Sequence, residues 1–262
     1  LTSSNSNTVT NAGTLTKTGT STIANTATDT YYAISNTGTA TISAGTINGS
    51  YRAIGNSGTL TVTAGTITAT SQIGIYNTST GILTVGTKET TPSVSTTVPS
   101  ITGKTYGISN ESGTFNFYDG VIKGQSGAGT AINGTVTETE TGYGVRKTVA
   151  TADSVTTETA ILVAKNYAEY NGSTLVNYYE TLASATTYVT SGNTIKPLVN
   201  RTETIESTVT SSKTVTLDLN GKTITLDGVT LRNNGELTIT GTGKLTSSNS
   251  NTVTNAGTLT KT

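Results

Sequence analysis

Apolar and polar residues alternate in short runs along this chain, and glycine, asparagine and serine separate the runs. The clearest runs carry an apolar residue at every second position, as in Leu60 and Val62 or Phe115 and Phe117. Such alternation is typical of a β-strand with one buried face. Threonine fills most of the intervening positions, and it favours strands, whereas glycine and asparagine favour turns. The pattern therefore predicts many short strands joined by tight turns.

The runs belong to a longer phrase that recurs along the chain: a small residue, isoleucine, a variable residue and asparagine, then Gly-Thr, an alternating run and Gly-Thr-Ile. Asn11, Asn36, Asn56 and Asn77 are 25, 20 and 21 residues apart, and Asn110 follows after 33. One such phrase cannot bury its apolar face alone, but stacked copies form a continuous core. We therefore predict an all-β fold, a parallel β-helix (β-solenoid) with about 20–25 residues per coil and strands ~4.8 Å apart.

Stacking places identical letters above one another in columns. One predicted column is an interior ladder of isoleucines: Ile34, Ile54, Ile75, Ile108 and Ile132. A second isoleucine column contains Ile23, Ile47, Ile67 and Ile122. Asn36, Asn56, Asn77 and Asn110 fall at one bend, where asparagine tolerates the left-handed conformation, and stacked amides can bond from coil to coil. We interpret these asparagines and isoleucines as a structural ladder; a binding groove along the asparagines is the alternative.

Three stretches depart from the repeat. Residues 86–106 contain Pro92 and Pro99 and are predicted to form a loop insertion, because proline removes a ladder donor. Residues 133–155 lack the phrase and are expected to be irregular. Residues 161–201 are predicted to be a capping or joint segment with one short amphipathic α-helix near 175–188, which Ser173 or Thr174 would cap. This helix is expected because Leu175, Val176, Tyr179, Leu182, Ala183 and Val189 share one stripe.

The segment LVNYYETLASATTYVTSGNTIKPL, followed by TVTSSKTVTLDLNGKTITLDG, joins that predicted helix to new strands. It resembles the opening of pectin-lyase-like right-handed parallel β-helix repeats in large bacterial surface and adhesin proteins. The coils NNGELTITGTGKL and NSGTLTVTAGTI are similar to the repeats of the same proteins. The resemblance implies the fold and a place outside the cell or at its surface. It is a poor guide to activity, because this fold hosts lyases, hydrolases, adhesins and stalks.

An identity of eighteen letters relates two distant parts of the chain: Leu1–Thr18 and Leu245–Thr262 have the same sequence, 244 residues apart. We expect the 262 residues to be a window of a longer polypeptide that repeats at this interval. The predicted organisation is solenoid coils over 1–160, the capping or joint segment over 161–201, and the first coils of the next repeat over 202–262.

Composition restricts the chemistry. Cys, His, Met and Trp are absent, 15 basic residues balance 15 acidic ones, and 32% of residues are hydrophobic. No disulfide framework, Ser–His triad, thiol nucleophile or ordinary zinc site follows from such a chain. The charge balance gives no signal for nucleic acid, and no apolar run approaches the ~20 residues of a membrane span.

Candidate catalytic groups are sparse. The aspartates are scattered, at Asp29, Asp119, Asp153, Asp218 and Asp227. Glu138 and Glu140, near Arg146 and Lys147, form the closest acidic pair, but they fall in an irregular stretch and we interpret them as solvated side chains rather than a catalytic dyad. The phrase Gly127-Ala-Gly129 lacks the lysine and helix of a phosphate loop. We therefore predict no enzyme activity, no catalytic residues, no cofactor and no metal.

The sequence favours a structural extracellular filament or stalk whose partner is another copy of itself, stacked head to tail. The alternative is a cell-surface adhesin that binds glycans or a host protein through its loops and through Tyr31, Tyr32, Tyr51 and Tyr106. A third interpretation is an ice- or surface-binding solenoid, suggested by the Thr-x-Thr runs at Thr14–Thr18 and Thr59–Thr63. The expected location is extracellular or at the cell surface.

Overall fold

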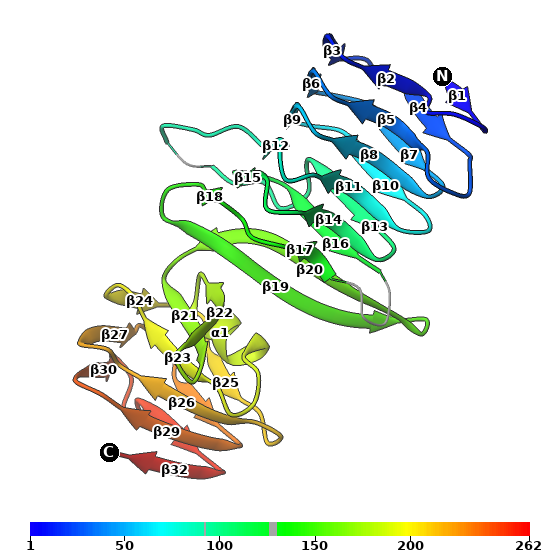
Figure 1. Ribbon diagram of the computed structural model, residues 1–262. Coiled ribbons are helices and arrows are strands. Elements are labelled where there is room, and N and C mark those ends of the chain that lie inside the picture. Colours follow the sequence, from blue (N-terminus) through cyan, green and yellow to red (C-terminus); the bar gives the residue numbers. More distant parts are fainter. Residues whose placement is uncertain (92, 126–129) are drawn as a thin grey trace. The chain divides into compact units, whose positions relative to one another are not determined.

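The computed structural model describes residues 1–91, 93–125 and 130–262. The fold is an all-β β-solenoid with turns of about 22 residues, as predicted, and the described residues contain one short helix. Figure 1 labels the elements, which form two compact units. Unit 1 comprises Leu1–Thr141 and Lys147–Leu162, and unit 2 comprises Gly142–Arg146 and Val163–Thr262.

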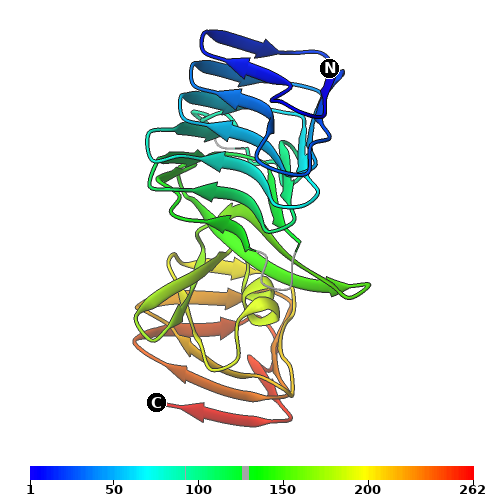
Figure 2. The ribbon, with the colours of Figure 1, turned by 45° about the vertical axis from the view of Figure 1, so that its right-hand side comes forward.

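Unit 1 is built from three sheets, and each turn of the solenoid adds one parallel strand to each sheet (Figure 2). Sheet A contains β1 (Thr2–Ser3), β4 (Thr22–Asn25), β7 (Thr46–Gly49), β10 (Thr66–Ala69), β13 (Ser100–Gly103) and β16 (Val121–Gly124). Sheet B contains β2 (Val9–Asn11), β5 (Tyr32–Asn36), β8 (Arg52–Asn56), β11 (Ile73–Asn77), β14 (Tyr106–Asn110) and β17 (Thr130–Asn133). Sheet C contains β3 (Thr14–Lys17), β6 (Thr39–Ile42), β9 (Thr59–Val62), β12 (Ile82–Val85), β15 (Thr114–Phe117) and β18 (Glu138–Thr139).

The register of these sheets produces columns of identical residues. In sheet B, Ile54 lies opposite Ile34 on one side and Ile75 on the other, and all three side chains are fully buried. Sheet A stacks Ile23, Ile47, Ile67, Ile101 and Ile122 in the same way. Each step removes apolar surface from water and completes the core that a single turn lacks.

The predicted insertion over 86–106 is too long. Residues 100–103 form β13, which pairs with β10 and β16, so the departure from the solenoid ends at Pro99. Ile101 then fills the isoleucine column, because it lies opposite Ile67 and Ile122 and is fully buried. Pro92 lies outside the described residues.

The expectation that 133–155 is irregular is wrong from Tyr143 onward, although residues 134–137 and 140–142 lie outside strands. β19 (Tyr143–Ala152) and β20 (Val155–Ala164) are the longest strands of the described chain, with ten residues each. Asp153 and Ser154 connect them with φ of 50° and 62°. β20 lies antiparallel on β16, pairing Ala160 with Ile122, and it therefore covers the last parallel edge of sheet A.

Unit 2 contains three further sheets. Sheet D contains β21 (Tyr167–Asn171), β22 (Thr174–Tyr179), β23 (Thr194–Pro197), β26 (Thr214–Asp218), β29 (Glu236–Thr240) and β32 (Thr258–Lys261). Sheet E contains β24 (Arg201–Glu203), β27 (Lys222–Leu226) and β30 (Gly243–Ser247). Sheet F contains β25 (Ser207–Val209), β28 (Leu231–Asn233) and β31 (Val253–Asn255). From β23 onward neighbouring strands are parallel, whereas β21 is antiparallel to both β22 and β23.

The helix α1 spans Leu182–Tyr188, so the predicted start at 175 is wrong. Leu175 and Val176 belong to β22 and are about two-fifths exposed, at 42% and 40%. The cap is Thr181 rather than Ser173 or Thr174: its hydroxyl accepts from the Ser184 backbone N–H, and the Ser184 hydroxyl accepts from the Thr181 N–H. Leu182 and Ala185 of α1 pack into the core of unit 2.

Candidate functional site: the asparagine ladder and the edge turns

A continuous chain of amide hydrogen bonds runs along sheet B of unit 1. The Nδ2 atoms of Asn11, Asn36, Asn56 and Asn77 each donate to Oδ1 of the asparagine one turn further on, at 2.7 Å in every case. Each Nδ2 also donates to backbone carbonyls; Asn56, for example, reaches Gly58 at 3.1 Å and Ile82 at 3.2 Å. The predicted residues Asn36, Asn56, Asn77 and Asn110 form one column, and Ile34, Ile54, Ile75 and Ile108 form its neighbour.

The ladder is buried and uses its own amides. Asn56 and Asn77 have no exposed surface, and their side-chain oxygens and nitrogens bond to protein atoms on both sides. A buried polar group that is fully bonded ties neighbouring turns together instead of recruiting a ligand. The geometry supports the structural interpretation of this column over the binding groove.

A glycine lies two positions after each of the first three asparagines, at Gly13, Gly38 and Gly58. A Cβ on Gly58 would lie 2.1 Å from the carbonyl oxygen of Gly38, and one on Gly38 would lie 2.2 Å from that of Gly13. These close approaches allow the backbone bonds from Thr59 N to Gly38 O and from Thr39 N to Gly13 O, both 2.8 Å. Any side chain here would push successive turns apart, which explains the Gly-Thr that follows Asn11, Asn36 and Asn56.

The acidic pair holds the insertion against the solenoid. Glu138 forms an ion pair with Lys88 and accepts a 2.7 Å hydrogen bond from the Tyr118 hydroxyl. Burial and this bond to Glu138 raise the pKa of Tyr118 to about 12. Glu140 is 2% exposed and accepts from the backbone N–H groups of Glu89 and Thr141 at 3.1 and 2.9 Å. Both carboxylates thus have structural partners, three of which lie within or beside the insertion.

The basic residues near that pair bind other carboxylates. Arg146 donates through one nitrogen to both oxygens of Glu180, at 2.9 and 3.0 Å, and Lys147 lies 3.5 Å from Glu158.

Two of the scattered aspartates have shifted pKa values. Asp218 pairs with Lys196 at 2.9 Å, and this contact lowers the pKa of Asp218. Burial raises the pKa of Asp119, although its carboxylate accepts backbone hydrogen bonds from Ser95 and Gly120.

Within the described ranges, no cluster of three or more Asp, Glu, His or Cys side chains is arranged to hold a metal ion. The Gly127-Ala-Gly129 phrase lies outside those ranges. The helix found in the described chain is neither long nor apolar enough to cross a membrane.

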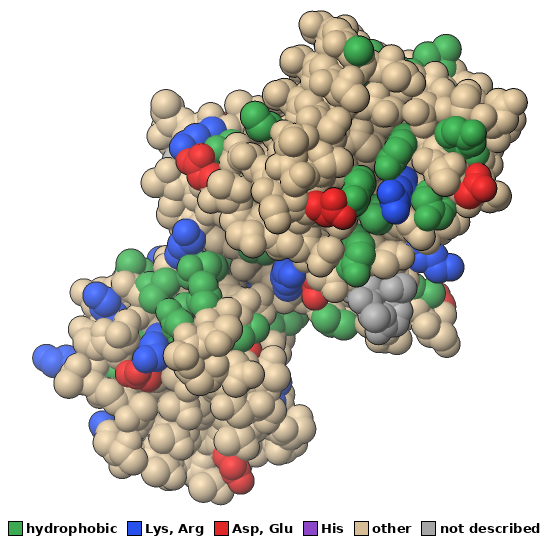
Figure 3. Space-filling model, viewed as in Figure 1, with side chains coloured by type: hydrophobic (Ala, Val, Ile, Leu, Met, Phe, Trp, Pro, Cys, Tyr) green, Lys and Arg blue, Asp and Glu red, His purple; other side chains and the backbone are tan. Residues whose placement is uncertain are grey.

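A group of tyrosines surrounds Arg52 on the outer side of sheet B. The Arg52 guanidinium lies 5.2 Å from the Tyr51 ring centre and 4.8 Å from that of Tyr76, and it donates to the Tyr32 hydroxyl at 3.2 Å. Figure 3 shows apolar and charged side chains gathered on one face of unit 1. The adhesin hypothesis named Tyr32 and Tyr51 but missed Tyr76 and Arg52, which only the register of neighbouring strands brings beside them. We call these four residues the Arg52 patch.

Threonine columns lie on the outer side of sheet C. Thr16, Thr41, Thr61 and Thr84 stack in register, and beside them Thr14, Thr39 and Thr59 do the same. Ile82 and Asn116 then interrupt the two columns. Outward threonine is a good strand residue in any solenoid, so the array alone does not single out surface binding.

Unit 2 contains buried carboxylates that the sequence interpretation missed. Glu169 has no exposed surface and accepts from the Tyr179 hydroxyl at 2.5 Å, Asn193 Nδ2 at 2.6 Å and the Thr190 backbone N–H at 2.9 Å. Burial alone would raise the pKa of Glu169, but these hydrogen bonds together lower it below its ordinary value. Glu203 similarly accepts from the Tyr167 hydroxyl at 2.9 Å, and burial raises the pKa of that tyrosine.

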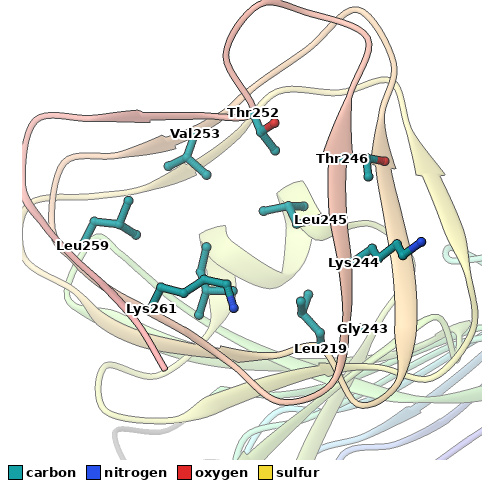
Figure 4. A pocket seen from close by; sticks show the side chains of 10 residues that line it. Leu219, Gly243, Lys244, Leu245, Thr246, Thr252, Val253, Leu259 and Lys261 are labelled. Atoms are coloured by element: carbon teal, nitrogen blue, oxygen red, sulfur yellow. The ribbon is translucent and has the colours of Figure 1, made fainter.

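The first turn of unit 1 and the last turn of unit 2 each lie at one edge of their sheets. We call these two the edge turns: β1, β2 and β3 in unit 1, and β30, β31 and β32 in unit 2. The edge turn of unit 2 surrounds a cavity of about 410 Å³, which is the open end of its core. In Figure 4 the side chains of Leu219, Leu245, Val253 and Leu259 point toward one another across this cavity, and Lys261 extends beside them.

No protein-family model matches this chain, and no curated protein or solved structure matches it either.

Proposed function

We propose that this protein is a structural element of an extracellular or cell-surface filament or stalk, in which β-solenoid repeats stack head to tail. One observation carries the proposal. The eighteen letters that form the edge turn of unit 1 recur in the edge turn of unit 2, in the same strand order. The partner that this implies is another copy of the same chain.

The physics of solenoids supports a structural role. Each turn contacts only its neighbours, so a stack can lengthen without any change to its core. A head-to-tail contact that does not close on itself yields a filament.

The order of elements in unit 2 supports the resemblance to pectin-lyase-like right-handed repeats of large bacterial surface proteins. The helix α1 precedes the parallel strands of unit 2, and the KTVTLDLNGKTI phrase covers β26 and the start of β27. This assignment, and the surface location that it implies, form part of our proposal.

Electron microscopy of negatively stained chains with several repeats tests the proposal. We expect thin rods in which each repeat contributes about eight turns, roughly 40 Å of solenoid at ~4.8 Å per turn, plus its capping strands. Compact, unconnected particles at every concentration would contradict a filament.

Denaturing electrophoresis of material from the source separates two kinds of filament. A ladder or a very large band indicates repeats joined in one chain. A single band near 26.7 kDa indicates assembly from separate short chains.

A second candidate function rests on the Arg52 patch. Aromatic rings beside a guanidinium offer stacking faces and hydrogen-bond donors of the kind that sugars use. The adhesin hypothesis predicts binding on a glycan array that Tyr76→Ala weakens, while Tyr118→Ala, beside the insertion, leaves it unchanged. Equal binding by both variants, or none by the parent protein, would remove this candidate.

A further inference from the structure

The eighteen-residue identity extends to the position of each strand. β1, β2 and β3 begin at Thr2, Val9 and Thr14, and Thr246, Val253 and Thr258 occupy the matching places in β30, β31 and β32. By this correspondence β30 of sheet E matches β1 of sheet A, β31 of sheet F matches β2 of sheet B, and β32 of sheet D matches β3 of sheet C. All three correspondences hold at the same offset of 244 residues, so the two edge turns are equivalent in sequence and in strand order.

The hydrogen-bond geometry is also the same on both sides of this turn. Asn233 Nδ2 donates to Asn255 Oδ1 at 2.7 Å, and Asn11, the counterpart of Asn255, donates to Asn36 Oδ1 at 2.7 Å. A Cβ on Gly257 would lie 2.0 Å from Gly235 O, as one on Gly38 would lie 2.2 Å from Gly13 O. The ladder of unit 2 therefore arrives at this turn in the register with which the ladder of unit 1 leaves it.

Two side chains that are buried in the edge turn of unit 1 are exposed in the edge turn of unit 2. Asn11 and Lys17 are 8% and 7% exposed in unit 1, whereas their counterparts Asn255 and Lys261 are exposed. Lys17 lies below Ile42 in an otherwise apolar column, and its ammonium donates to the carbonyl oxygens of Gly19 and Ala44. Both carbonyls belong to residues that come after β3, the last strand of the edge turn. Lys261 lines the open cavity, where the same two carbonyls would meet its ammonium (Figure 4).

Chain length at the corner decides how two copies join. At this corner the chain passes from sheet C to sheet A in unit 1, and from sheet D to sheet E in unit 2. The inward-facing residue after the corner follows the one before it by five positions from Ile42 to Ile47, and by six from Ile239 to Leu245. If Gly19 follows Thr262, then Ile23 follows Lys261 by six positions. If Leu1 follows Thr262, then Leu1 follows Lys261 by only two, which is too short to turn this corner.

We propose that a second copy of this chain covers the cavity by sharing this turn: β30–β32 of one copy take the place of β1–β3 of the next. The strands β4, β5 and β6 of the next copy then lie on β30, β31 and β32, and one asparagine ladder runs from Asn233 through Asn255 to Asn36 and beyond. This junction deepens the proposed function and rests on it, since it specifies how successive repeats of the filament meet.

The test compares two double-length proteins. In the shared-turn protein, residues 1–262 are continued by a second copy that starts at Gly19. In the matched control the second copy starts at Leu1, so the eighteen residues occur twice in succession. Amide hydrogen exchange in Thr258–Lys261 of the first copy should slow at least about tenfold in the shared-turn protein relative to the control, because local opening would then break a covered turn.

A crosslink provides a second measurement. The chain has no cysteine, so Thr246→Cys in the first copy and Ala24→Cys in the second introduce a single pair. Thr2, the counterpart of Thr246, lies opposite Ala24 on the neighbouring strand, a position that suits a disulfide. We expect mild oxidation to link the pair in the shared-turn protein and not in the control.

Unchanged exchange together with no crosslink in the shared-turn protein would overturn the junction, and so would equal protection and crosslinking in both proteins. Neither measurement requires filaments. If the crosslink forms while longer arrays show no rods, the proposed filament is wrong and the junction stands. If rods form without the crosslink, the filament stands and the proposed junction is wrong.

Discussion

The two solenoids both contain a ladder of asparagine amides, but they differ in how far the ladder extends and in the polar groups buried beside it. Unit 1 uses the same neutral side chain in turn after turn, so each amide of the ladder is both donor and acceptor to its neighbours. Unit 2 concentrates charge at its first strands, where Glu169 and Glu203 accept from Tyr179 and Tyr167. A ladder of amides can be extended indefinitely, whereas a carboxylate surrounded by donors completes an end.

This difference separates repeated turns from a cap. The side chains of the ladder are neutral amides, so adding a further asparagine to it buries no charge. At the start of unit 2 the antiparallel strands β21 and β22 and the helix α1 close the core around groups that occur once. The two designs should therefore respond differently to substitution and to acid.

The largest effect is expected when charge enters the ladder. Asn56→Asp removes the donors to Asn77, Gly58 and Ile82 and buries a carboxylate facing their oxygens. We expect the free energy of unfolding of unit 1 to fall by about 4 kcal/mol, the cost of an uncompensated buried charge. Urea denaturation measures it. Asn48→Asp, on the exposed face of the adjacent β7, is the control and should change stability little. Equal losses in the two variants would contradict a specific cost of placing charge in the ladder.

A smaller loss is expected from the isoleucine column. Ile54→Ala leaves a cavity between Ile34 and Ile75 in a fully buried position and should cost about 3 kcal/mol. Ile82→Ala removes a side chain that is 45% exposed and should cost much less. Thermal unfolding of the two variants compares them. Similar midpoints for both would contradict a core that runs along this column.

In unit 2, Glu169→Gln replaces an acceptor of several hydrogen bonds by an amide with one fewer acceptor. If the amide oxygen keeps the bonds from the Thr190 N–H and Asn193 Nδ2, the amide nitrogen cannot accept from the Tyr179 hydroxyl, and we expect a loss of about 2 kcal/mol. Hydrogen exchange in β21–β23 should report it, while the ladder strands of unit 1 keep their protection. Loss of protection in β5 and β8 instead would break the comparison.

The smallest effect is expected from acid, which should destabilise the first strands of unit 2 before the ladder strands of unit 1. Because the folded pKa of Glu169 lies below its ordinary value of 4.5, its carboxylate stabilises unit 2 fully above that value. The contribution is lost as the pH falls through the lowered folded pKa, whereas the amide ladder has no group that titrates there. Exchange protection of β21–β23 should therefore decline before that of β5 and β8, and Glu169→Gln should remove the difference.

The repeated parts of this fold could be predicted because a column demands the same residue in each turn. Ile34, Ile54 and Ile75 are visible as such in the sequence. Ile101 was missed because Pro99 stands just before it and the insertion hid the recurring interval, although the Ile-Thr-Gly that begins at Ile101 matches the strand β10.

The parts that occur once could not be found by recurrence. The pair Asn171-Gly172, with Gly172 at a φ of 59°, is a typical hairpin signal between β21 and β22 that a helical interpretation of Leu175 and Val176 overrode. The Thr181–Ser184 capping box marked the true helix start. No local signal foretells Glu169, because its partners come from β22 and from the segment after α1.

The corner between β12 and β13 shows how much sequence this scaffold admits. Three residues join β9 to β10, whereas residues 86–99 separate Val85 from Ser100, and the columns on both sides keep their register. A foreign peptide grafted there would leave the core untouched. In a polymer of these modules the peptide would be displayed once per repeat, at a spacing equal to the length of one repeat.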